Sequence, residues 1–98
     1  MTIKKTEQNG ALTVALEGRL DTNTAPELEA ELRQSMEGVN KLILDMDRLV
    51  YISSAGLRVL LSAQKVMNRQ GAMTIRNVSP EIMEIFEVTG FVDILNIE

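Results

Sequence analysis

Three consecutive aliphatic residues, Leu42, Ile43 and Leu44, restrict the fold of this chain more than any other feature. A short unbroken apolar run is typical of a central strand that is covered on both faces. A segment with helical spacing follows it at 54–69, and Gly71 is the signal that ends this helix. A buried strand that leads into a long helix predicts an α/β fold with a sheet that is parallel in its centre.

The remaining segments alternate between strand and helix patterns. Asn9-Gly10 favours a type I′ turn, which joins two strands in a hairpin. Thr24 and Glu27 predict a capping box at the start of a further helix. The predicted elements, in chain order, are strands at 3–8 and 11–17, a helix at 24–37, a strand at 41–46, the helix at 54–69, a strand at 73–78, a helix at 79–89 and an optional strand at 92–97.

This order, ββαβαβα with an optional final β, predicts a mixed sheet of four to five strands. The sheet is expected to be parallel in its centre, with helices packed against it. The chain has 98 residues, of which 45% are hydrophobic, so we expect one domain spanning residues 1–98. Since no oligomer signal is evident, a monomer is expected.

The absence of histidine and cysteine excludes several classes of function. Without histidine there is no imidazole base, no Ser-His-Asp triad and no histidine-ligated metal. Without cysteine there is no disulfide, thiolate nucleophile or zinc–thiolate cluster, which fits a reducing cytoplasm. No phosphate-binding loop of the type G-x-x-x-x-G-K-[ST] is present. We therefore expect a non-enzymatic protein without a cofactor or metal site.

The charge and hydropathy of the chain argue against two kinds of partner. The net charge of −4 disfavours nucleic acid, which binds clustered lysine and arginine, and also an anionic membrane surface. No segment approaches the roughly 20 apolar residues of a membrane span, and no apolar run follows the N-terminus as in a secretory signal. A cytoplasmic location is therefore expected.

Two adjacent serines, Ser53 and Ser54, stand where the predicted strand-exit loop turns into a helix. A helix start presents unpaired N–H groups and a partial positive charge, so it can hold a phosphoryl group without refolding. The simpler interpretation is an ordinary N-cap, worth about 1 kcal/mol. The two interpretations, phosphoryl acceptor and N-cap, are compatible if one serine caps the helix and the other is modified. Gly56, in the first turn, indicates close packing on the sheet or close approach of a partner, and packing is favoured.

The helix predicted at 54–69 carries more than one kind of surface. Its polar residues fall on a narrow stripe at 100° per residue: Arg58, Ser62, Lys65 and Arg69. Some apolar residues lie beyond the face that a single sheet needs: Ala55, Val59 and Val66. They predict contact with a neighbouring helix or, alternatively, a partner surface.

Acidic residues lie near two predicted strand ends. Parallel strands end at the same edge of a sheet, so Asp21, Asp45 and Asp47 are expected to cluster with the two serines. Aspartates at such an edge can bind Mg²⁺ or accept a phosphoryl group, which gives an alternative function as a small phosphoryl-carrying or ligand-binding domain. Turn and cap chemistry is the favoured interpretation of these aspartates.

Three parts of the chain match a known pattern. The first combines 42–45 with 49–61, which contains Ser-Ser-Ala-Gly-Leu at 53–57. The second is the Gly-Arg-Leu-Asp turn at 18–21, and the third is Ser-Pro at 79–80 with 86–91. Together they resemble the STAS domain family, specifically the bacterial anti-sigma factor antagonists, over nearly the whole chain. The resemblance implies a STAS-like fold.

The same resemblance implies a protein that switches partners. In this family the unmodified antagonist binds an anti-sigma factor serine/threonine kinase, which frees the sigma factor for transcription. The kinase phosphorylates the serine at the helix start, which breaks the complex, and a metal-dependent serine phosphatase restores it. By position, Ser54 is the acceptor. The docking surface is implied to consist of Asp21, Ser53, Ser54, Ala55, Gly56 and Arg58.

Two positions depart from the family pattern. Many members carry aspartate immediately before the acceptor, where this chain has Ser53, and serine or threonine after it, where this chain has Ala55. These departures leave open which of the two serines is modified. Some family members work in transporter-associated or stress-signalling complexes, so a STAS subunit without a phosphorylation switch is the alternative function.

Overall fold

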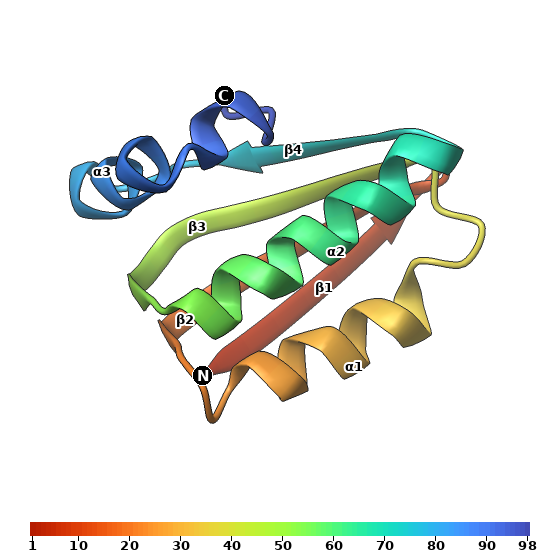
Figure 1. Cartoon of the computed structure of the whole chain (residues 1–98). Helices are drawn as coiled ribbons and strands as arrows, with labels where there is room; N and C mark the ends of the chain where they lie inside the picture. Colours follow the sequence, from red (N-terminus) through yellow and green to blue (C-terminus); the bar gives the residue numbers. More distant parts are fainter.

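The computed structural model describes all 98 residues, Met1 to Glu98, and shows a four-stranded mixed sheet with helices packed against it (Figure 1). The strand order is β1-β2-β3-β4. β1 is antiparallel to β2, whereas β2, β3 and β4 are parallel, as predicted. The elements are β1 (Thr2–Gln8), β2 (Ala11–Leu20), α1 (Ala25–Ser35), β3 (Lys41–Ile52), α2 (Ser54–Gln70), β4 (Ala72–Arg76), α3 (Pro80–Thr89) and a 3₁₀ helix, η1 (Phe91–Asp93).

The turn between β1 and β2 is the one that Asn9-Gly10 predicts. Both residues have positive φ, 52° at Asn9 and 82° at Gly10, as a type I′ turn requires. The turn of a hairpin sets its register, and the register decides which side chains of a strand face the core. β2 consequently presents Leu12, Val14 and Leu16 on one face, and all three are buried.

The two crossover helices, α1 and α2, lie side by side on one face of the sheet (Figure 1). Right-handed crossovers between strands in the order β2-β3-β4 place successive helices on the same side. Leu42 and Leu44 of β3 pair with Leu12 and Val14 of β2 and share their core. Ile43 points to the opposite face, yet it is only 8% exposed, so the apolar run is buried as predicted.

β3 continues to Ile52, beyond the end predicted at residue 46. Its pairing with β2 contains two register shifts, at which β3 has an extra residue. Because of these bulges, the buried residues Met46, Leu49 and Ile52 recur at every third position instead of every second. The prediction rested on an unbroken apolar run, which the exposed residues Asp47 and Arg48 interrupt, and the predicted end was therefore wrong.

All three helices start where predicted, but the predicted capping hydrogen bonds at α1 are not formed. Ser79 caps α3, and Gly90 ends it with φ 80°. At α1, the Thr24 hydroxyl makes no capping hydrogen bond and instead donates to the carbonyl of Arg19 at 2.8 Å. The predicted capping box between Thr24 and Glu27 is therefore wrong, because this hydroxyl holds the turn between β2 and α1.

The C-terminal segment ties the chain to β4 without adding a full strand. α3 and η1 lead to a single parallel bridge between Ile75 and Ile97. The N–H of Ile75 donates to the carbonyl of Asn96, and the N–H of Glu98 donates to the carbonyl of Ile75, both at 2.8 Å. The optional final strand is thus reduced to one bridge. Among the helices, none combines the length and the apolar character that crossing a membrane requires.

Candidate functional site

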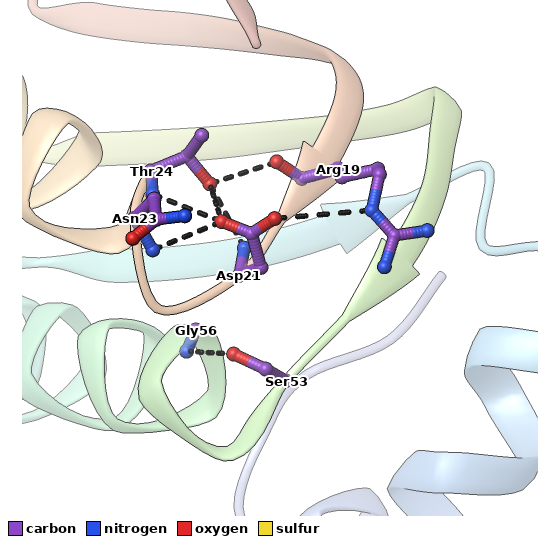
Figure 2. A network of polar contacts seen from close by, with 6 residues as sticks. All are labelled: Arg19, Asp21, Asn23, Thr24, Ser53 and Gly56. Atoms are coloured by element: carbon purple, nitrogen blue, oxygen red, sulfur yellow. Dashed lines mark hydrogen bonds and ion pairs between the residues drawn. The ribbon is translucent and has the colours of Figure 1, made fainter.

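The carboxyl ends of β2 and β3 lie side by side and bring two of the predicted segments together. The N–H of Ser53 donates to the carbonyl of Leu20 at 2.9 Å, and Leu20 lies opposite Ile52 in the register. Asp21 and Ser53 therefore leave the same edge of the sheet from neighbouring strands, as Figure 2 shows. The expected proximity of Asp21 to the serines is confirmed.

The two serines at the start of α2 have different roles in the fold. Ser53 is the N-cap, with extended backbone angles, and its Oγ accepts the N–H of Gly56 at 3.4 Å (Figure 2). Ser54 is the first residue of the helix, and its side chain is exposed. The hydroxyl that the fold uses is therefore that of Ser53, while that of Ser54 faces solvent.

The start of α2 favours an added negative charge. The N–H groups of Ser54 and Ala55 belong to the first turn, so they have no acceptor within the helix. No acidic side chain lies in that turn to offset the partial positive charge of the helix end. An anion attached to Ser54 would meet unpaired N–H groups and this favourable field.

Gly56 allows the start of α2 to lie close to the sheet. A Cβ at this position would lie 2.7 Å from Cγ of Leu20 and 2.9 Å from Cγ1 of Ile52. Real Cβ atoms do not approach other atoms so closely without displacing them. Packing of Gly56 against the ends of β2 and β3, which was the favoured prediction, is confirmed.

Asp21 orders the turn that leads from β2 into α1. Its Oδ1 accepts the N–H of Thr24 at 3.1 Å and that of Asn23 at 3.0 Å (Figure 2). These hydrogen bonds, the one from Thr24 first, stabilise the charged carboxylate and lower the pKa of Asp21 below its ordinary value of 3.8. The Arg19 guanidinium, 3.8 Å away, acts in the same direction. Asp21 is thus a charged turn residue at the edge of the site.

Two residues of this edge were not singled out from the sequence. Arg19 and Tyr51 lie opposite each other in the register of β2 and β3, and the guanidinium carbon of Arg19 lies 4.1 Å from the centroid of the Tyr51 ring. Tyr51 is 38% exposed, and Val50 beside it is 70% exposed. A guanidinium at this distance from the face of an aromatic ring makes a favourable cation–π contact. Only the bulged register brings the pair together, so sequence spacing gave no signal.

Arg58 follows Ser54 by one turn on α2. Residues four apart on a helix are neighbours on its surface, so these two side chains occupy the same face. Arg58 is exposed and takes part in none of the four ion pairs of the protein. It is therefore available to an anion at Ser54 or to a partner.

Asp45 and Asp47 do not join this site, contrary to the expectation of one cluster. Both lie within β3, and Asp45 is opposite Ala15 in mid-strand, because β3 ends only at Ile52. Oδ1 of Asp45 accepts the N–H of Asp47 at 3.1 Å and the side-chain amide of Asn77 at 3.0 Å. The first contact stays within the strand and the second joins β3 to Asn77, just after β4, so the favoured turn and cap interpretation was wrong for these two aspartates.

Comparison with known protein families and curated sequences identifies relatives over most of the chain. The STAS domain family matches residues 2–98. BtrV of Bordetella bronchiseptica, a candidate anti-sigma factor antagonist, is 41% identical over 88 residues, which cover 88% of this chain and 76% of that protein. The anti-sigma-B factor antagonist of Staphylococcus aureus is 29% identical over 99 aligned positions, which cover 99% of this chain and 92% of that protein.

Solved structures show the same fold at lower sequence identity. The anti-sigma factor antagonist SpoIIAA in its unphosphorylated form has a TM-score of 0.78 and 17% identity, covering 99% of this chain and 87% of its own. SpoIIAA of Bacillus in the phosphorylated form has a TM-score of 0.77 and 18% identity, covering 99% and 91%. Because the family match spans nearly the whole chain, this protein belongs to the STAS domain family.

Proposed function

We propose that this protein is an anti-sigma factor antagonist that switches partners through Ser54. In the unmodified state it binds an anti-sigma factor serine/threonine kinase. Phosphorylation of Ser54 ends that complex, and a metal-dependent serine phosphatase restores the unmodified protein. The names of the two curated relatives support this function, as does the shared fold with SpoIIAA, which has been solved in unphosphorylated and phosphorylated forms.

The division of roles between the two serines carries the proposal. A kinase needs a hydroxyl that can enter its active site, and the fold must tolerate the product. Ser53 is half-buried and its Oγ holds the N–H of Gly56, so modification there would disturb the helix cap. Ser54 is exposed at the first helical position and serves no cap. The acceptor is therefore assigned to Ser54.

The modification is a transfer of the γ-phosphoryl group of ATP. Oγ of Ser54 forms a bond to phosphorus while the bond from phosphorus to the bridging oxygen of ADP breaks. The hydroxyl proton passes to a base of the kinase, and ADP leaves. All catalytic groups belong to the kinase, so this chain supplies only the acceptor and its presentation.

Phosphorylation would act on docking and leave the fold intact. The added phosphate carries about −1.5 to −2 charges at pH 7, and the free N–H groups of the first turn of α2 accommodate it. Burying this strongly hydrated group in a contact surface requires desolvation. A loss of about 3–5 kcal/mol in association would lower the affinity by two to four decades.

The assignment is tested by incubating the protein with its cognate kinase and ATP and locating the phosphate by mass spectrometry. Phosphate is expected on Ser54. Ser53→Ala is the matched variant, because it keeps the proposed acceptor and should still be phosphorylated, whereas Ser54→Ala should not. Phosphate on Ser53 alone would overturn the assignment.

The switch is tested with Ser54→Asp. This variant should keep the circular dichroism spectrum of the wild type and bind the kinase weakly in calorimetry. Ser54→Ala, which adds no charge, should bind as tightly as the wild type. Unchanged affinity of the aspartate variant would count against the switch. Co-purification with a membrane transporter complex in place of a kinase would favour the alternative function.

A further inference from the structure

The exposed face of α2 carries charge of one sign only. The helix contains three cationic side chains and no acidic one, although the chain as a whole has a net charge of −4. The cationic side chains, Arg58, Lys65 and Arg69, are all exposed. They are seven and four positions apart and so fall on one side of the helix over roughly 16 Å. We call them the basic stripe.

The basic stripe has no counter-ions within the protein. The four ion pairs of the structure involve Lys5, Arg19, Arg33 and Arg76, and none includes a residue of the stripe. The neighbouring helix α1 differs, because Arg33 there pairs with Glu29 at 3.2 Å in the usual i, i+4 arrangement. An exposed helix normally mixes charges of both signs. The positive charge of the stripe is therefore not neutralised by acidic side chains of the same molecule.

An apolar groove runs beside the stripe, between α1 and α2, which lie next to each other in Figure 1. Its volume is about 480 Å³, and its apolar lining consists of Leu32, Met36, Val59, Ala63 and Val66. Ser62 lines the groove and also lies between the stripe residues on the helix surface, so the two features are continuous. The opposite rim, formed by α1 and the residues just after it, carries Glu29, Arg33 and Glu37, and Glu29 pairs with Arg33.

We propose that the basic stripe and this groove together dock an acidic amphipathic helix of the anti-sigma partner, an inference that rests on the proposed function. Apolar side chains of that helix enter the groove, and its acidic side chains lie over α2. The opposite rim attracts acids less, because Arg33 there is already paired with Glu29 and Glu37 would repel them. The basic stripe therefore decides both the charge and the direction of the partner helix.

Other occupants fit these observations less well. Nucleic acid and anionic membranes need larger clusters of cations, and here the groove beside the stripe is lined by the acids Glu29 and Glu37. A second copy of the chain would have to place its acidic α3 on α2. The apolar residues of α3, Ile82 and Phe86, are buried in the core of their own molecule, so this helix cannot also fill the groove. A separate protein with an acidic helix is the remaining solution.

The stripe also gives the switch a physical cause. Arg58, its first member, is one turn from Ser54, so a phosphate on Ser54 lies within reach of this guanidinium. The phosphate neutralises the head of the stripe and repels the acids of the incoming helix. Phosphorylation thus acts on the same charges that attract the partner.

The proposal is tested by the kinetics of kinase binding to a double charge reversal, Lys65→Glu/Arg69→Glu. These positions lie away from Ser54, so the variant leaves the proposed acceptor and the start of α2 unchanged. Lys4→Glu/Lys41→Glu is the matched control, because it changes the net charge equally on exposed residues outside α2. The association rate constant at low salt should fall about 10-fold or more for the stripe variant and less than about 3-fold for the control. Equal effects would overturn the proposal.

The groove is tested by its effect on dissociation. Val66 lines it and is 43% exposed, whereas Val88 on α3 is 80% exposed and lies outside it. Val66→Ser should raise the dissociation rate constant several-fold, and Val88→Ser should not change it. If Val66→Ser leaves dissociation unchanged, apolar docking in the groove is excluded.

A second measurement separates this proposal from the proposed function. A synthetic helical peptide with leucines on one face and glutamates beside them is titrated into the isotope-labelled protein. Saturable amide shifts should map to α2 and disappear in the stripe variant, and the same peptide with lysine for glutamate should cause none. This outcome supports docking of an acidic helix on the basic stripe even if the protein binds no kinase. Absence of these shifts overturns it, as does tighter binding of duplex DNA or phosphatidylserine vesicles, or stripe-dependent self-association in sedimentation.

Discussion

Gly56 lies directly against Leu20, so closely that a Cβ on the glycine would be 2.7 Å from Cγ of the leucine. This contact joins the first turn of α2 to the last residue of β2. It fixes how far the helix start can approach the sheet edge, and thereby where Ser54 stands relative to Asp21. The position of the proposed acceptor thus depends on a missing side chain.

Replacing Gly56 with alanine should destabilise the protein. Overpacking of a filled site costs about 1–3 kcal/mol, and the better helix propensity of alanine returns about 1 kcal/mol. We expect a net loss of about 1 kcal/mol in the free energy of unfolding, measured by urea denaturation. Ser62→Ala, an exposed change on the same helix, should be neutral or slightly stabilising. If Gly56→Ala were more stable than the wild type, the side chains of Leu20 and Ile52 would be able to move away from the added Cβ without loss of stability.

Ser53 and Ser79 are two serine caps in similar geometry, accepting N–H groups at 3.4 Å and 3.3 Å. Loss of such a cap costs about 0.5–2 kcal/mol. Ser53→Ala and Ser79→Ala should therefore lose similar amounts of stability in chemical denaturation. Only Ser53→Ala should also weaken kinase binding, because fraying at the start of α2 disorders the docking surface. An unchanged stability of Ser53→Ala would contradict the assigned cap.

The carboxylate of Asp21 should make stability dependent on pH in the acid range. Its folded-state pKa lies below 3.8, so its stabilising contribution is present above that value and is lost as pH falls through the folded-state pKa. Asp21→Asn should be less stable than the wild type near neutral pH, and the difference should shrink below pH 3.8. A carbon-13 NMR titration of the carboxyl group gives the pKa directly. Titration at or above 3.8 would contradict the role given to the Thr24 and Asn23 N–H groups.

Gln64 is 7% exposed, and its Oε1 has no hydrogen-bond partner, while its Nε2 donates to Asn68 at 2.8 Å. A buried unsatisfied oxygen costs about 1–3 kcal/mol, and the hydrogen bond returns about 1 kcal/mol. Gln64→Met, which keeps the size and removes both groups, should raise the free energy of unfolding by about 1 kcal/mol. Asn68→Ala should lower it, because both ends of the Gln64 amide then lack a partner. A less stable methionine variant would indicate that Oε1 is satisfied in solution.

Local patterns predicted those parts of the molecule in which one short segment decides the outcome. The turn at Asn9-Gly10 and the helix that begins at Ser54 are of this kind, because φ preference and helix spacing act within a few residues. Thr24 shows the limit of such patterns. The same residue types can form a capping box or hold a turn, and the contact with Arg19 selects the turn.

The sequence by itself determined the order of strands and helices, the buried run at the centre of the sheet, and the placement of two serines at a helix start, since periodicity and turn chemistry are local. Tertiary structure decided which strand positions are bulged, that Asp45 and Asp47 stay in mid-strand, that Arg19 stacks on Tyr51, and which serine faces solvent. These features depend on the register between β2 and β3. Register is set by burial across the whole sheet, so no segment carries it alone.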